Sequence, residues 1–421
     1  MPITYGSVCS GIEAATEAWH PLGWSADWYA EIEPFPCAVL AYRYPNTPNH
    51  GDMTRLAAMV LSGKIPAPEV LVGGTPCQSF SVAGMREGLA DPRGALIIKY
   101  VELLDAIDHV RTKRGEPEAA CLWENVPGVL SDKGNAFGCF LGALAGEDCE
   151  LQPSGKRWPD AGCVFGPKRT VAWRILDAQY FGLAQRRRRV FVVASARAGF
   201  DPLEVLFERE GLRRDTPPRR GEGQDVAGTL ASRTEGEGFP GTDEALAGYI
   251  QPTAFGGGRT GGSIEVAATL VAKGQKCDFE VESFVVHGTQ DPDVRINQAH
   301  ALGRNNGQEN AVCITGAISH TLKGEGFDAS EDGTGRGQSM VNGDAGVRRL
   351  TPFECELLQG FPGVHTLIPY RGKPAEECPD GPRYKAIGNS KAVLVVRWIG
   401  QRLGRQLKTS LFESTHPRTS R

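Results

Sequence analysis

The feature that most constrains the fold is an alternation of short apolar runs and helical patterns over about the first 200 residues. The run Ile3–Val8 is followed by a turn and then by a helical pattern at Gly11–Trp19. Apolar side chains between Leu96 and Val110 recur at three- and four-residue steps, which marks one face of an amphipathic helix. Strands that alternate with helices predict an α/β fold with a largely parallel, doubly wound sheet. Further predicted strands are Asp27–Ile32, Val70–Gly73, Ala120–Trp123 and Val190–Ala194.

The stretch from 201 to 346 has a different character, because it is rich in glycine and lacks a long helical period. Three similar segments that end in Thr-Leu occur at 226–230, 266–270 and 318–322, and Phe284–Val286 is an apolar run. Short strands with glycine turns predict an irregular β-rich module. A disordered insertion is the alternative that the glycine content also fits.

The helical pattern returns after 347. Thr351, Pro352 and Glu354 supply an N-cap, a proline at the first helical position and an acid three residues after the cap. A second helix is predicted at Val393–Leu407. We therefore expect 1–200 and 347–407 to form one domain around the inserted 201–346, with 408–421 as a flexible tail.

Charge and cysteine use exclude several classes of protein. Lys and Arg number 46 against 50 Asp and Glu, a formal net charge of -4, which excludes a generally cationic protein that coats nucleic acid but not a local basic site. No apolar run reaches the roughly 18 residues of a membrane span, and the N-terminus lacks a secretory signal. The 11 cysteines include no C-x-x-C pair. We expect a cytoplasmic protein with reduced thiols, no metal site and no membrane partner.

Chemically distinctive residues follow the predicted strands. Cys77 comes after a double glycine at the end of Val70–Gly73, and the Gly-rich, charged loop beyond it predicts a mobile lid. Glu124 ends another strand, where a carboxyl group can hydrogen-bond a ring nitrogen. Arg187 and Arg189 alternate along a strand, so both share one face and either could enter a cleft.

Together these segments resemble, in residues and in order, the cytosine-C5 DNA methyltransferase family of restriction–modification and phage systems. The resemblance covers about 1–200 and 347–400, and it places the family's target-recognition domain on the insert. The similar segments are Pro76-Cys77-Gln78 (nucleophile motif), Glu124-Asn125-Val126 (second catalytic motif), Gln185–Arg189 (Gln-x-Arg-x-Arg motif), 349–362 and 388–390.

The resemblance implies a DNA (cytosine-5-)-methyltransferase with a Rossmann-like sheet. Such an enzyme moves a methyl group from S-adenosylmethionine to C5 of a flipped-out cytosine in a specific double-stranded DNA sequence, and releases S-adenosylhomocysteine. Cys77 would add to C6 as the nucleophile, because C5 alone is poorly nucleophilic. Glu124 would donate to N3, and Arg187 or Arg189 would stabilise charge near O2.

The resemblance also implies binding residues. Glu31 would hold the cofactor's ribose and Asp52 its adenine amine, while Gly11 and Asn389 would lie near its methionine part. The implied cofactor set is Cys9, Ser10, Gly11, Ile12, Glu31, Ile32, Asp52, Met53, Gly73, Asn389 and Ser390. The implied DNA contacts are Gln78, Ser81, Arg86 and Arg93.

The chain departs from the family pattern near the cofactor. Glu13 stands where another glycine is usual, which could alter the pocket unless its side chain points into the helix. Lys391 stands where an apolar residue is usual. It either caps a helix, lies at the surface, or lies near the methyl end of the cofactor and changes cofactor preference. We expect the ordinary cofactor.

Two other functions fit the same motifs. The substrate could be tRNA, although an insert of this length favours a module that reads DNA. The protein could also be a catalytically silent DNA-binding relative, but the intact Cys77, Glu124 and Arg187 favour an active enzyme. The repeats of the insert are three copies of one unit, which we favour, or elements that read several sites. We expect a monomer, either solitary and phage-borne or paired with a cognate restriction endonuclease.

Overall fold

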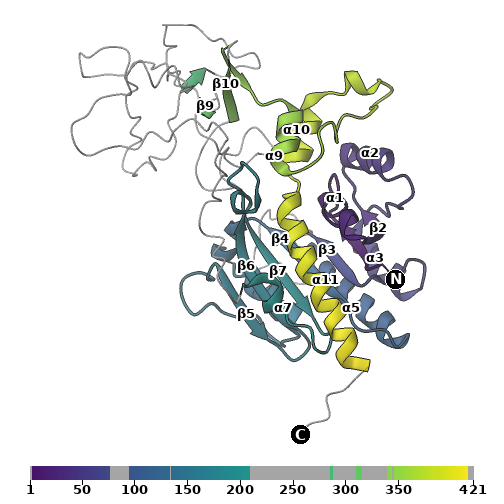
Figure 1. Cartoon of the computed structure of the whole chain (residues 1–421). Helices are drawn as coiled ribbons and strands as arrows, with labels where there is room; N and C mark the ends of the chain where they lie inside the picture. Colours follow the sequence, from purple (N-terminus) through teal and green to yellow (C-terminus); the bar gives the residue numbers. More distant parts are fainter. Residues whose placement is uncertain are drawn as a thin grey trace, which may run out of the picture.

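The structure is a computed structural model of the chain (Figure 1). It describes residues 2–75, 94–132, 134–208, 285–287, 310–314, 339–343 and 346–415, with side chains for 2–75, 96–132, 134–208 and 350–409. A seven-stranded sheet forms the centre of the molecule, and a separate four-stranded sheet lies beyond α9 (Pro352–Gln359), at the end away from the C-terminus.

The large sheet has the strand order β2-β1-β3-β4-β7-β6-β5. The first four strands pair in parallel, but β4 pairs with β7, β7 with β6 and β6 with β5 in antiparallel fashion. The prediction of an α/β fold is confirmed, and the sheet is mixed rather than largely parallel. The strands are β1 Thr4–Val8, β2 Ser25–Ala30, β3 Val70–Gly73, β4 Ala120–Asn125, β5 Ala161–Phe165, β6 Thr170–Asp177 and β7 Arg188–Ser195.

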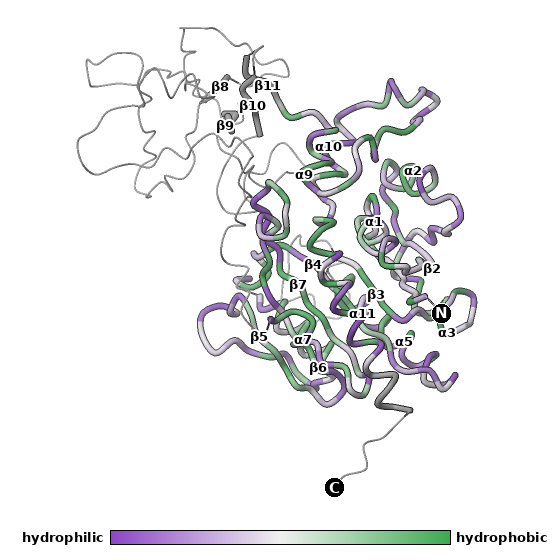
Figure 2. Tube along the Cα trace, viewed as in Figure 1, coloured by the Kyte–Doolittle hydropathy of each residue, from purple (hydrophilic) through white to green (hydrophobic). Residues whose placement is uncertain are grey.

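Helices cover both faces of this sheet, because the central strands are apolar on both sides. Along β3, Val70 and Val72 pack in one core cluster with α1 and α11, whereas Leu71 packs in the other with α3, α5 and α6. Figure 2 shows the hydrophobic residues following the central strands. The helices are α1 Ala14–Trp19, α2 Pro34–Arg43, α3 Leu56–Leu61, α5 Gly94–Lys113, α6 Ala136–Ala145, α7 Pro202–Leu206, α10 Asp380–Gly388 and α11 Val393–Thr415.

Capping side chains near the helix ends determine where two of the helices begin. Thr351 and Glu354 form the predicted capping box at the start of α9, with Pro352 at the first position. α1 begins at Ala14 rather than at Gly11, because Glu13 adopts a left-handed conformation (φ +64°) and caps the helix through the Thr16 amide. α11 continues to Thr415, beyond Leu407, where the sequence predicts that this helix ends.

In the insert, the structure describes four short strands in the order β11-β10-β9-β8. The predicted run Phe284–Val286 corresponds to β8, whereas the three Thr-Leu repeats lie outside the described residues. α7, just past the predicted boundary at 200, packs with the large sheet, since Val205 and Leu206 are buried in its core. The remaining bounds are β8 Val285–His287, β9 Asn310–Ile314, β10 Ser339–Gly343 and β11 Gly346–Arg349.

Candidate active site

The sheet directions bring the predicted catalytic carboxylate and one arginine together. β4 ends with Glu124 and Asn125, and the antiparallel β7 starts at the same edge, where Asn125 pairs with Val190. The preceding residue, Arg189, therefore lies beside Glu124, and its Nε is 3.4 Å from Glu124 Oε1. Both residues are buried, at 4% and 9% exposure. In such surroundings the attraction between the two charges is little screened.

The ends of β3 and β4 are joined by hydrogen bonds from two side chains of β4. Asn125 Nδ2 donates to the Thr75 carbonyl oxygen over 2.9 Å, and Trp123 Nε1 donates to Thr75 Oγ1 over 3.2 Å. Gly74 permits this approach, since a Cβ there would lie 2.6 Å from the Glu124 carbonyl oxygen. The chain thus runs past Glu124 immediately before Cys77. Cys77 itself, with Gln78, Ser81, Arg86 and Arg93, lies outside the described residues.

Arg187 has a different environment from Arg189. It precedes β7, and its Nη2 donates to the carbonyl oxygens of Gly388 (3.0 Å) and Ser390 (2.7 Å). The prediction that Arg187 and Arg189 lie on the same face of one strand does not apply, because Arg187 is not part of β7. Its guanidinium holds the C-terminal turn 388–390, whereas Arg189 contacts Glu124.

We expect the Arg187→Met variant to lose about 3 kcal/mol of the free energy of unfolding, because the carbonyl groups of Gly388 and Ser390 would each lose a charged donor and Ser390 would keep only the donor of Gln359. Urea denaturation measures this loss. The exposed neighbour provides a control, since Arg188→Met removes only a solvent-exposed ion pair with Asp160 and should cost under about 1 kcal/mol. Equal losses in the two variants would contradict a structural role for Arg187.

The predicted cofactor residues form a connected pair of turns after β1 and β2. Gly11 has φ +59° and open space where a Cβ would stand, so a ligand can approach its backbone. Its amide donates to Glu31 Oε2 over 2.7 Å, and the amides of Ile32 and Glu33 both donate to Glu31 Oε1. Three donors leave room for about one more on this carboxylate. The residues present therefore fit a ligand with hydroxyl groups beside Glu31.

Other predicted cofactor residues surround these turns. Ile32 is 71% exposed. Asp52 is exposed and caps a short helix, and the hydrogen bond from the Thr54 amide lowers the pKa of its carboxyl group. Met53 is buried, with its sulfur 3.6 Å from that of Cys9. The remaining predicted residues also lie at this edge or at the C-terminal turn: buried Ser10, Ile12, Gly73 and Ser390, and exposed Asn389.

Several supporting residues were missed by the sequence analysis. Asn49 Oδ1 accepts from the Glu31 amide and its Nδ2 donates to the Glu31 carbonyl oxygen, which fixes the end of β2. His365 Nε2 lies 2.8 Å from the Ile12 carbonyl oxygen. Gln359 Nε2 donates to the carbonyl oxygens of Ile387 and Ser390. No local pattern marks them, because each contacts residues distant in the sequence.

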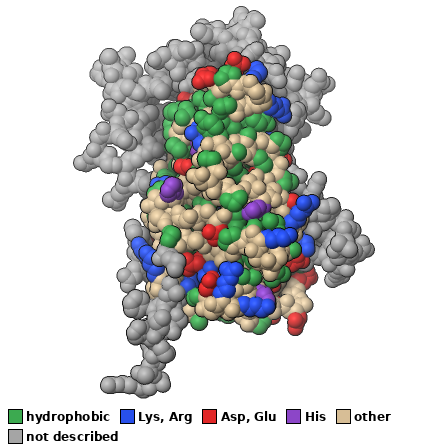
Figure 3. Space-filling view, turned by 90° about the vertical axis from the view of Figure 1, so that its right-hand side faces the viewer, with side chains coloured by type: hydrophobic (Ala, Val, Ile, Leu, Met, Phe, Trp, Pro, Cys, Tyr) green, Lys and Arg blue, Asp and Glu red, His purple; other side chains and the backbone are tan. Residues whose placement is uncertain are grey.

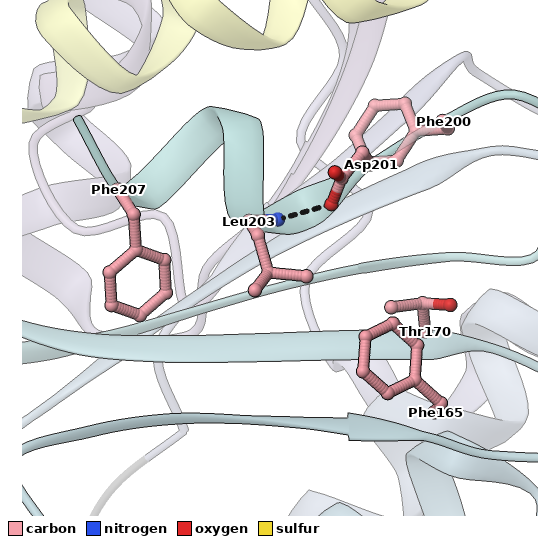
Figure 4. Close-up of a pocket in the computed structure, with 6 residues that line it drawn as sticks. All are labelled: Phe165, Thr170, Phe200, Asp201, Leu203 and Phe207. Atoms are coloured by element: carbon pink, nitrogen blue, oxygen red, sulfur yellow. Dashed lines mark hydrogen bonds between the residues drawn. The ribbon is translucent and has the colours of Figure 1, made fainter. Parts of the chain in front are cut away.

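Other features lie away from this edge. A surface pocket bounded by apolar side chains and Asp201 lies between α7 and the start of β6 (Figure 4). Thr170 lines it and pairs with Ser195, which also pairs with Ala120, so this is the opposite end of the sheet from Glu124. On the face in Figure 3, Lys and Arg lie among Asp and Glu rather than in one basic surface.

Among the described residues, no cluster of three His, Cys, Asp or Glu side chains has the geometry of a metal site. Within the same residues, no helix combines the length and the apolar character needed to cross a membrane. The described cysteines with placed side chains, among them Cys9 and Cys121, are free thiols.

The mixed seven-stranded sheet, with polar turns after its parallel strands and an ion pair where β4 and β7 meet, defines an α/β protein whose polar residues gather at one edge of the sheet. The C-5 cytosine-specific DNA methylase model matches residues 3–405, and the chain belongs to this family. The crystal structure of S. pombe Dnmt2 methyltransferase shares the fold, with a TM-score of 0.54, 14% identity and coverage of 96% of this chain and 99% of that one.

Two named relatives are similar in sequence. A protein of Escherichia phage P1, named DNA N-6-adenine-methyltransferase, is 45% identical over 464 residues, which cover 95% of this chain and 61% of that protein. Type II methyltransferase M.AquIA of Picosynechococcus sp. is 32% identical over 196 residues, which cover 45% of this chain and 70% of that protein. The chain thus spans less than two thirds of the phage protein. The name of that protein specifies adenine, whereas the family model specifies cytosine.

Proposed function

We propose that this chain is a DNA (cytosine-5-)-methyltransferase that uses S-adenosylmethionine as the methyl donor. The observation that carries the proposal is the Arg189–Glu124 pair, buried at the sheet edge where the chain enters the segment of Cys77. A carboxyl group and a guanidinium side by side suit a pyrimidine, whose N3 and O2 are neighbours. Methylation of an adenine amine needs no covalent addition to the ring.

In the proposed reaction, the Cys77 thiolate forms a bond to C6, and the electron pair of the C5–C6 double bond moves toward C5. Glu124, protonated when the base binds, donates its proton toward N3, and Arg189 stabilises the charge that develops at O2. When bound, S-adenosylmethionine supplies an electrophilic methyl group for C5. A base then removes the C5 proton, and the sulfur leaves C6 as the double bond forms again.

The cofactor would be held by the turns after β1 and β2. Glu31 has an acceptor site for a ribose hydroxyl, and the exposed Asp52 is available to the adenine amine. The open space at Gly11 leaves room for the methionine part.

The remaining expectations belong to the same proposal. The segment 201–346 would read the target sequence in double-stranded DNA, with Gln78, Ser81, Arg86 and Arg93 as further contacts. The protein would act as a cytoplasmic monomer, either alone or beside a cognate restriction endonuclease.

Duplex DNA incubated with the full chain and S-adenosylmethionine is expected to contain 5-methylcytosine and no N6-methyladenine. Mass spectrometry of the digested nucleosides measures both bases in one sample. A parallel reaction with tRNA tests the alternative substrate, and we expect no product there. N6-methyladenine without 5-methylcytosine, or methylated tRNA with unmodified DNA, would contradict the proposal.

A further inference from the structure

Lys391 is a buried cation whose ammonium group has no ion-pair or hydrogen-bond partner among the described side chains. It lies between the turn 388–390 and the start of α11, and only 8% of its surface is exposed. Among the described side chains, no carboxylate oxygen comes within 4.0 Å of its ammonium group, and no acceptor is hydrogen-bonded to it. A buried ammonium without partners is costly, so an anion is expected in its surroundings.

The packing of α1 against α11 brings Lys391 to the level of the turn after β1. Trp19 Nε1 donates to the Val396 carbonyl oxygen over 2.9 Å, and Ile12 shares a core cluster with Val393. Burial raises the pKa of the Glu13 carboxyl and that of the Cys9 thiol (to about 12), while the positive charge of Lys391 lowers both. Lys391 therefore acts electrostatically on the residues on either side of Gly11.

Glu13 does not supply the missing partner, because neither of its carboxylate oxygens lies within 4.0 Å of the Lys391 ammonium group. The Ser7 hydroxyl donates to Oε1, while the Thr16 hydroxyl (2.6 Å) and the Thr16 amide (3.1 Å) donate to Oε2. These hydrogen bonds hold the Glu13 carboxylate toward Ser7 and Thr16. Glu13 offsets the charge of Lys391 at a distance and leaves its ammonium donors available.

We propose that Lys391 binds the α-carboxylate of the methionine part of S-adenosylmethionine. The inference rests on the proposed function, since it assumes that this cofactor occupies the edge beside Gly11. Of the cofactor's parts, only the amino-acid end carries a carboxylate, and an ammonium group is its electrostatic complement. The residue that departs from the family pattern is thus a specificity-determining residue for this end of the cofactor.

The test compares two ligands that differ at the amino-acid end. Isothermal titration calorimetry measures the Kd of S-adenosylhomocysteine and of 5′-methylthioadenosine, which lacks that end, for the full chain and its Lys391→Met variant. We expect the substitution to raise the Kd of S-adenosylhomocysteine about 10- to 100-fold, as for loss of a charged hydrogen bond. The Kd of 5′-methylthioadenosine should stay unchanged, and Lys391→Arg should restore most of the lost affinity.

A merely structural role would give a different result. If Lys391 only neutralised Glu13, Lys391→Met would weaken both ligands equally, and that result would overturn the inference, as would an unchanged Kd for S-adenosylhomocysteine. Should Lys391→Met fold poorly, the double variant Glu13→Gln/Lys391→Met removes both buried charges and should still lose selectivity between the ligands. Selective binding by a wild-type chain that leaves cytosine unmethylated would contradict the proposed function while supporting the role of Lys391.

Discussion

The Cys77→Ser variant is expected to transfer no measurable methyl group to cytosine and to form no covalent adduct with DNA that contains 5-fluorocytosine. A serine hydroxyl is not ionised at neutral pH, so it cannot replace a thiolate in the addition to C6. Fluorine at C5 cannot leave as a proton does, which traps the adduct formed by the wild-type chain. Incorporation of tritiated methyl groups and a shifted band in a denaturing gel measure the two losses.

Cys163→Ser provides the matched control for this experiment. Cys163 is an exposed free thiol on β5, at the far side of the sheet from β3, so both transfer and adduct formation should be retained. Cys77→Ser should still bind S-adenosylhomocysteine, which shows that the variant is folded. Adduct formation by Cys77→Ser would identify a different nucleophile and overturn the proposed mechanism.

The sequence predicts the candidate site because polar residues directly follow the apolar runs of the predicted strands. β3 and β4 were predicted from apolar runs, and Glu124 was identified because a polar residue follows such a run directly. The strand directions were not predictable in the same way. A local pattern of apolar residues is the same for a parallel and an antiparallel strand, and only the pairing with β4 reveals that β7 runs the other way.

The start of β7 at Arg188 separates the two arginines of the predicted catalytic set. From the sequence, Arg187 and Arg189 were equivalent candidates, because strand alternation places both on one face. In the structure β7 begins at Arg188, so Arg187 turns to the carbonyl groups of Gly388 and Ser390. Those partners lie 201 and 203 residues away along the chain, beyond the reach of any periodicity argument.

Glu124→Gln and Arg189→Lys are each expected to reduce kcat for cytosine methylation about 100- to 1,000-fold, with a much smaller effect on the affinity for S-adenosylhomocysteine. Each variant weakens an interaction with charge that develops on the pyrimidine in the transition state. Glutamine keeps the shape of Glu124 but is a poor acid. Lysine keeps the charge of Arg189 but lacks the planar guanidinium that lies 3.4 Å from Glu124.

Steady-state kinetics at saturating cofactor measures kcat, and the retained affinity for S-adenosylhomocysteine shows that each variant is folded. Because the two side chains form a buried pair that acts on one ring, the double variant should be little slower than either single variant. Arg188→Met changes the exposed arginine next to Arg189 and should leave kcat within about threefold of the wild-type value. Losses that multiply in the double variant would show that Glu124 and Arg189 act independently, against a shared role at N3 and O2.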